Sequence, residues 1–143
     1  MLKVALDGDG FSISEIKLRV EELLYYNPLC GDSVLEEQGR RGWYFLKEPT
    51  PRSRTRTWEE QQVLVGKGDE VPSAVDVVYA VLSHFFSTGE RLFREVGVRT
   101  SSVDIYGHHI IVKWIGDVLC VCCGKDDRRY SSLGLAVIIY PRV

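Results

Sequence analysis

Residues 109–123 read HIIVKWIGDVLCVCC, and this stretch decides the class of fold. Two apolar runs, 109–115 and 118–123, are joined by Gly116-Asp117, and a two-residue turn of this kind closes a tight hairpin. Consecutive strands joined by short turns pair antiparallel, because parallel strands need a long crossover connection. We therefore expect an antiparallel sheet at the centre of the fold.

Further strands are expected on both sides of this hairpin, because apolar runs recur between Gly, Pro and Asp clusters. A second hairpin is predicted from 33–38 and 43–47, with the basic sequence Gly39-Arg40-Arg41-Gly42 at its tip. A strand is also predicted over 54–65, before the turn Gly66-Lys67-Gly68-Asp69. The remaining expected strands are 2–6, 98–106 and 133–140.

Two helices are predicted between these strands. Ser12 and Glu15 have the spacing of a capping box, and Asn27-Pro28 would end the helix that they open. The second helix begins after Ser73 and is apolar on more than one face, so it is buried on both sides or meets another subunit. The expected fold is α+β, in the order β-α-β-β-β-α-β-β-β-β. Its two helices pack on a mainly antiparallel sheet of about six to seven strands, within a single domain over residues 1–143.

Composition narrows the class of protein. The chain has 143 residues, of which 45% are hydrophobic and 27% charged, so intrinsic disorder is not expected. The formal net charge of −2 excludes a globally basic nucleic-acid binder. No apolar run approaches the roughly 20 residues that span a bilayer, and no secretory signal is visible. The sequence therefore predicts a cytoplasmic protein without a membrane partner.

Four cysteines, three of them within four residues, do not form the pattern of a secreted disulfide framework. Cys120 and Cys123 have C-x-x-C spacing, and His109 lies close in sequence, which raises the alternative of a metal site. On a strand, however, Cys120 and Cys122 face one side and Cys123 the other. We therefore expect these three residues and Cys30 to be reduced thiols, mostly in the core, and we expect no metal or cofactor.

Residues 4–11 read VALDGDGF, an apolar strand followed by Asp-x-Asp-Gly. This motif resembles the nucleophile motif of haloacid-dehalogenase-type phosphatases, and residues 121–127 resemble the strand and acidic pair of their metal site. Together the two segments cover about 15 of the 143 residues. The resemblance implies that Asp7 attacks phosphorus and Asp9 acts as acid and base, with Mg²⁺ held near Asp126 and Asp127.

A charge asymmetry is the strongest functional feature. Residues 39–58 contain six bases and one acid, a net charge of +5, which leaves 12 − 19 = −7 on the rest of the chain. Arg52, Arg54 and Arg56 recur at every second residue, so an extended strand would project all three to one face at roughly 6.5–7 Å spacing. That spacing is comparable to successive phosphates on a nucleic-acid strand, and Trp43 and Trp58 could stack on bases.

The sequence therefore favours a non-enzymatic binding or assembly module, expected to self-associate or to bind a protein partner, with no catalytic residues assigned. One alternative is a nucleic-acid or other polyanion binder that uses the same arginines, and another is a solvated edge strand protected by its charge. A third is a metal-dependent phosphohydrolase that uses Asp7 and Asp9. The expected contact residues are Arg40, Arg41, Trp43, Arg52, Arg54, Arg56 and Trp58.

Overall fold

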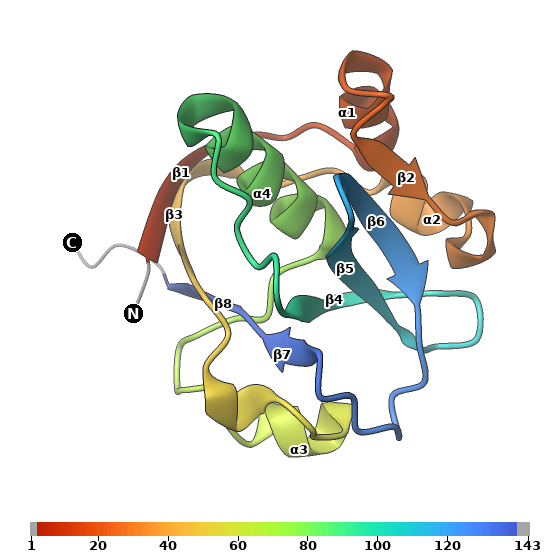
Figure 1. The fold of residues 1–143 in the computed structure, drawn as a ribbon. Coiled ribbons are helices and arrows are strands. Elements are labelled where there is room, and N and C mark those ends of the chain that lie inside the picture. The colour runs from red at the N-terminus through yellow and green to blue at the C-terminus, as the bar shows by residue number, and fades with distance from the viewer. Residues whose placement is uncertain (1–2, 140–143) are drawn as a thin grey trace.

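Two sheets and a long central helix make up the α+β fold that the computed structural model describes for residues 3–139 (Figure 1). The larger sheet has the strand order β2-β6-β5-β4-β7. Its strands are β2 (Leu24–Tyr26), β4 (Gly97–Val103), β5 (His109–Ile115), β6 (Val118–Cys123) and β7 (Leu133–Leu135). The predicted β5–β6 hairpin is confirmed, with Ile115 opposite Val118 and a φ of 60° at Gly116, a value that glycine adopts without strain.

A second, three-stranded sheet has the order β1-β3-β8. Its strands are β1 (Lys3–Asp9), β3 (Arg41–Lys47) and β8 (Val137–Ile139), and both pairings are antiparallel. In the described residues, parallel pairing joins β2 to β6 and β4 to β7, and the other ladders are antiparallel. The α+β class and the mainly antiparallel pairing are thus confirmed, with the strands divided between two sheets.

Helix α4 (Ala74–Thr88) lies between the two sheets and packs against β1, β4, β5 and α1 (Figure 1). The Ser73 hydroxyl accepts a hydrogen bond from the first turn, and Gly89, with a φ of 77°, ends the helix. Residues on several faces of α4 are fully buried, including Val75, Val77 and Val78. Burial within this chain therefore accounts for the many-sided apolar surface. Within residues 3–139, no helix is long and apolar enough to cross a membrane.

Three shorter helices lie at opposite ends of the molecule. They are α1 (Ile13–Arg19), α2 (Asp32–Glu36) and α3 (Trp58–Gln62), and two 3₁₀ turns, Pro28–Cys30 and Pro51–Ser53, accompany them. The capping box of Ser12 and Glu15 is confirmed, although α1 ends before the predicted boundary. The residues after it form β2 because Leu24 and Tyr26 are buried beside β6. Figure 1 shows α1 and α2 far from α3.

The predicted hairpin of 33–38 with 43–47 is wrong. Residues 32–36 form α2, and β3 pairs instead with β1 and β8. These two long-range partners allow β3 to bury Tyr44 and Leu46, which both have 1% exposure. Burial between two strands therefore prevails over the local turn of glycines and arginines.

The predicted strand over 54–65 is also wrong. Thr57 and Glu60 form a capping box that begins α3, with the Thr57 hydroxyl accepting from the Glu60 N–H at 3.2 Å. Before this helix, Pro51 opens a 3₁₀ turn and Thr55 has a positive φ of 56°. The arginines at 52, 54 and 56 therefore do not form a stripe along one face of an extended strand.

Candidate interaction surface

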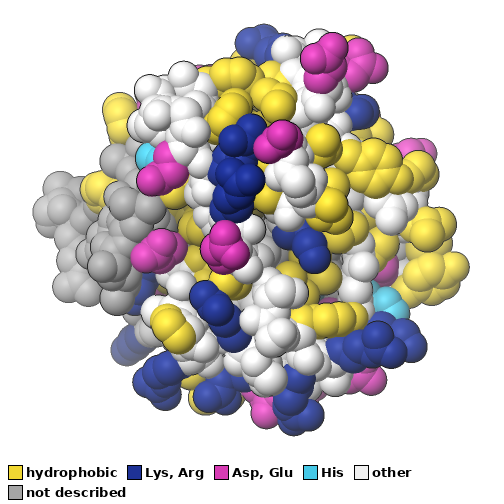
Figure 2. All heavy atoms as spheres, in the orientation of Figure 1, with side chains coloured by type: hydrophobic (Ala, Val, Ile, Leu, Met, Phe, Trp, Pro, Cys, Tyr) yellow, Lys and Arg dark blue, Asp and Glu magenta, His cyan; other side chains and the backbone are white. Residues whose placement is uncertain are grey.

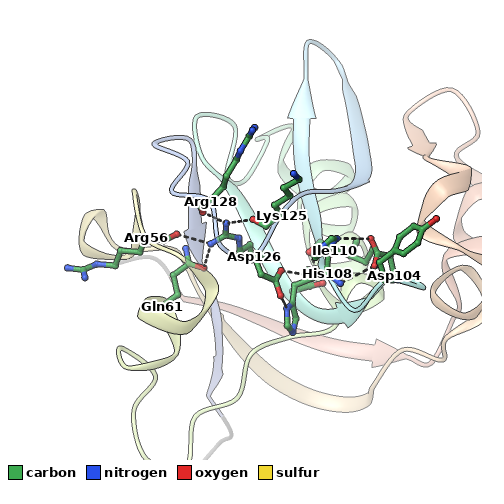
Figure 3. Close-up of polar contacts among 12 residues, drawn as sticks. Arg56, Gln61, Asp104, His108, Ile110, Lys125, Asp126 and Arg128 are labelled. Atoms are coloured by element: carbon green, nitrogen blue, oxygen red, sulfur yellow. Dashed lines mark hydrogen bonds and ion pairs between the residues drawn. The ribbon is translucent and has the colours of Figure 1, made fainter.

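A buried arginine organises the end of the molecule that carries α3. Arg99 lies in β4 and is only 1% exposed. Its guanidinium donates hydrogen bonds to the carbonyl oxygens of Arg56 (2.8 Å), Lys125 (3.2 Å) and Arg128 (2.6 Å), and to the side-chain oxygen of Gln61 (3.2 Å) (Figure 3). Burial lowers the pKa of Arg99, and these four acceptors replace the water that the buried cation has lost.

Two further backbone bonds join the same segments. The Thr55 N–H donates to the Tyr130 carbonyl at 3.1 Å, and the Trp58 N–H donates to the Asp126 carbonyl at 2.8 Å. Residues 52–58 and 124–130 are far apart in sequence, yet Arg99 and these bonds hold them side by side. We refer to this arrangement as the Arg99 clamp.

An aromatic and ionic contact adds to the clamp. The Trp58 ring stacks on His109 with centroids 3.5 Å apart and planes inclined by 12°. His109 Nδ1 lies 2.7 Å from Asp126 Oδ2, and the His109 backbone N–H donates to Asp126 Oδ1 at 2.8 Å. The contact therefore fixes the position of Trp58.

Four of the expected contact residues lie together at this end. Arg52 and Arg54 are exposed, and Arg56 is half-buried with its Nε donating to the Arg52 carbonyl at 2.5 Å. Trp58 is the first residue of α3 and is partly covered by His109. The 3₁₀ turn Pro51–Ser53 and the first residue of α3 thus bring these side chains to the same end of the molecule.

The other three expected contact residues lie elsewhere. Arg40 is half-buried, and it pairs with Glu70 at 2.7 Å while its backbone N–H donates to Asp76 at 2.8 Å. It therefore anchors the start of β3 to α4 and is not the tip of a hairpin. Arg41 and Trp43 are exposed on β3, where Trp43 keeps 65% of its surface accessible. They belong to the small sheet, at the opposite end of β3 from residues 51–57.

Three basic residues missing from the expected set join this surface from the 124–130 turn. We define the basic end as Arg52, Arg54, Arg56, Lys125, Arg128 and Arg129. Among the described residues, Arg129 is the member with an ion pair, at 2.8 Å from Glu60. That contact, together with the Thr57 N–H, lowers the pKa of Glu60 to about 2. Figure 2 shows Lys and Arg side chains gathered along the lower edge of the molecule, on the side of α3.

Carboxylates also belong to the segments that form the basic end. Residues 52–60 and 125–130 contain six bases and four acids, a net charge of 6 − 4 = +2. Three of these acids, Glu59, Asp126 and Asp127, line a pocket of about 220 Å³ with Thr57 and Trp58. The accessible part of Trp58 thus lies among negative charges, while His109 covers one of its faces.

A group of acidic side chains occupies the region of α1 and α2. We define the acidic end as Glu15, Glu21, Glu22, Asp32, Glu36 and Glu37, which are all exposed. Residues 12–38 contain two bases, so this region carries 2 − 6 = −4. In the part of the chain that the structure describes, no cation forms an ion pair with any member of the acidic end. Figure 1 places α1 and α2 opposite α3.

The four aspartates expected in a metal site do not come together. Asp7 and Asp9 contact Tyr79 of α4, whose hydroxyl donates to the Asp7 carbonyl at 2.8 Å and to Asp9 Oδ2 at 3.1 Å. Asp126 pairs with His109, as described above. Within residues 3–139, no group of three or more His, Cys, Asp or Glu residues is placed to hold a metal ion. The arrangement thus lacks the shared metal shell that the phosphatase resemblance implies.

Comparisons with known proteins assign no family to this chain. No protein-family model matches the chain, and neither the curated proteins nor the solved structures contain a match.

Proposed function

We propose that this protein is a non-enzymatic assembly module in which the basic end of one copy binds the acidic end of another. The observation that carries the proposal is the separation of charge along the molecule. The Arg99 clamp gathers six basic side chains around α3, whereas six exposed carboxylates surround α1 and α2. Opposite charges on separate surfaces of one chain are complementary between two copies.

A protein surface fits the basic end better than a nucleic acid does. Base stacking on Trp58 would require an open ring face, but His109 covers one face and carboxylates line the adjoining pocket. The arginines also lack the strand geometry that would match the spacing of phosphates. Carboxylates of a second copy are separate anions, and they do not depend on such a regular spacing.

The contact joins two different surfaces, so the assembly is head-to-tail. Such contacts build rings when the rotation between copies closes and open chains when it does not. Apart from half-buried Arg56, the charges at both ends are exposed, and salt screens exposed charges over about 8 Å at physiological ionic strength. Assembly should therefore be strongest at low salt.

Charge reversal tests the proposal. Light scattering after size exclusion, at low and high salt, should show oligomers of the natural chain that dissociate as salt rises. Arg52→Glu with Arg54→Glu should weaken association about tenfold or more, because attraction becomes repulsion. Glu21→Lys with Glu22→Lys should do the same, and mixing the two variants should restore association. The double variant Arg41→Glu with Lys67→Glu changes the charge equally outside both ends and should associate normally.

Three results would overturn this proposal. The natural chain could remain monomeric at low salt, or oligomers could persist in high salt and in both reversed variants, which would indicate apolar contacts. Salt-sensitive binding of single-stranded or duplex nucleic acid by a monomer, lost in Arg52→Glu with Arg54→Glu, would replace it with the polyanion alternative.

A further inference from the structure

Two cysteine thiols from distant parts of the chain face each other beside the larger sheet. Cys30 closes the 3₁₀ turn after β2, Cys123 is the last residue of β6, and their Sγ atoms are 3.5 Å apart. Parallel pairing of β2 with β6 causes this approach, since Tyr26 lies opposite Val121 and the Asn27 N–H donates to the Val121 carbonyl at 2.9 Å. The two residues are 93 positions apart in sequence, so the contact depends on the completed sheet.

We propose that Cys30 and Cys123 form a reversible disulfide, and that this pair is a thiol-oxidation site for small oxidants of the peroxide or disulfide class. A disulfide requires sulfur atoms about 2.05 Å apart, so the two sulfurs need to approach by about 1.5 Å. Side-chain rotations at the end of a strand and in a short turn can supply a movement of that size. The inference does not depend on self-association.

Exposure assigns different roles to the two thiols. Cys123 is half-buried and can meet an oxidant from solvent, whereas Cys30 is 1% exposed. Burial and the neighbouring Cys123 raise the pKa of the Cys30 thiol, which favours Cys123 as the first residue to react. Cys30, already in contact with Cys123, then acts as the resolving thiol.

The reaction with hydrogen peroxide balances in two steps. The Cys123 thiolate attacks one peroxide oxygen, the O–O bond breaks, and the departing hydroxide takes a proton, leaving a sulfenic acid and one water. The Cys30 sulfur then attacks the Cys123 sulfur and loses its proton, the S–O bond breaks, and a second water leaves. The two sulfurs together lose two electrons, which reduce the peroxide. A dithiol reductant reverses the bond by exchange.

The other two cysteines provide the control. Strand alternation turns Cys120 and Cys122 away from the face that Cys123 occupies. The Cys120 thiol lies 3.7 Å from the Val118 carbonyl, and no described thiol contact links it to Cys122. Oxidation should therefore select one pair from the four thiols.

The test uses the full natural chain, treated with a small molar excess of hydrogen peroxide or with glutathione disulfide. Alkylation under denaturing conditions should then modify two thiols instead of four, and intact mass should show the loss of two hydrogen atoms. Peptide mapping should find Cys30 joined to Cys123, and dithiothreitol should restore four reactive thiols. Cys120→Ser with Cys122→Ser should still form the bond, and Cys123→Ser should not.

The mapping on the natural chain tests the inference even where a variant folds poorly. Four thiols that remain reactive after oxidation would overturn it. A bond between a different pair, a bond between two chains, or oxidation of Cys123 to a sulfinic acid without cross-linking would overturn it as well. Association measured by light scattering plays no part in this result, so the proposed function can fail while the disulfide forms.

Discussion

The acidic end and the basic end are built in different ways. A local signal forms the α1 part of the acidic end, because Ser12 caps α1 through Glu15, and the carboxylates follow one another within residues 15–37. The basic end depends on long-range contacts, since Arg99 reaches carbonyl oxygens 43 residues before it and 29 residues after it. The two oppositely charged surfaces thus differ in origin. Nearby residues in the sequence supply the acidic end, whereas the basic end exists only in the completed fold.

Of the substitutions considered, removal of the Arg99 clamp should have the largest effect on stability and should act mainly on the basic end. Arg99→Met leaves three backbone carbonyls and the Gln61 side chain without their donor in a buried site. We expect the free energy of unfolding to fall by about 3 kcal/mol or more, measured by urea denaturation. Hydrogen exchange should accelerate first in residues 54–58 and 125–130.

Arg94→Met is the matched control, because Arg94 is exposed and removal of its charge leaves no buried acceptor. It should change stability by less than about 0.5 kcal/mol. If Arg99→Met unfolds no more easily than Arg94→Met, the clamp does not hold the basic end. Faster exchange in α1 and α2, at the same rate as in residues 54–58, would show that the two ends are not independent.

Removing the cap of α1 should have a smaller effect, confined to the acidic end. Ser12→Ala deletes the hydroxyl that accepts the Glu15 N–H at 3.2 Å. We expect a loss of about 1 kcal/mol in urea denaturation, with faster exchange in residues 13–19. Ser12→Asn keeps a capping oxygen and should retain most of the stability. Equal losses from the two substitutions would assign the effect to the packing of buried Ser12 rather than to its cap.

The smallest effect concerns the ion pair at the basic end. Arg129 and the Thr57 N–H hold the pKa of Glu60 at about 2, below its ordinary value of 4.5. A lowered folded-state pKa contributes stability that is fully present above pH 4.5 and is lost as the pH falls toward 2. Arg129→Gln should raise the pKa of Glu60 and flatten the stability profile in this window, as carboxyl NMR titration and acid unfolding would report.

Arg128→Gln is the control for this titration, because Arg128 forms no ion pair with a described residue. It should leave the pKa of Glu60 near 2. The difference between the two variants should shrink at high salt, since the Glu60 side chain is partly exposed to solvent. An unchanged titration of Glu60 in Arg129→Gln would assign the low pKa to the capping box of α3 alone.

Elements with local signals could be predicted from the sequence. The β5–β6 hairpin follows from two apolar runs around Gly116-Asp117, and α4 follows from Ser73 and the apolar residues after it. The spacing of Thr57 and Glu60 also signals α3. The alternating arginines before it obscure this signal, because alternation of charge imitates the period of a strand without burying a face.

The candidate surface could be predicted only in part. Arg52, Arg54 and Arg56 are visible as a basic cluster, whereas their neighbours Lys125 and Arg128 come from a turn about 70 residues away. The acceptors of Arg99 are mostly backbone carbonyls, which every residue type possesses and which leave no sequence signature. The contact of Cys30 with Cys123 likewise depends on the pairing of β2 with β6.

Because Arg99 binds mostly backbone carbonyls, the conformation of the basic end depends little on which side chains the clamped segments carry. The clamp holds Arg56, Lys125 and Arg128 by their carbonyl oxygens. The side chains of Lys125 and Arg128 are exposed and do not support the clamp, whereas the Arg56 side chain donates to the Arg52 carbonyl. Other residues that permit the same backbone conformation could replace Lys125 and Arg128 while the clamp stays intact. The surface side chains of the basic end could therefore change, by divergence or by design, to suit a different partner while the backbone beneath them keeps its conformation.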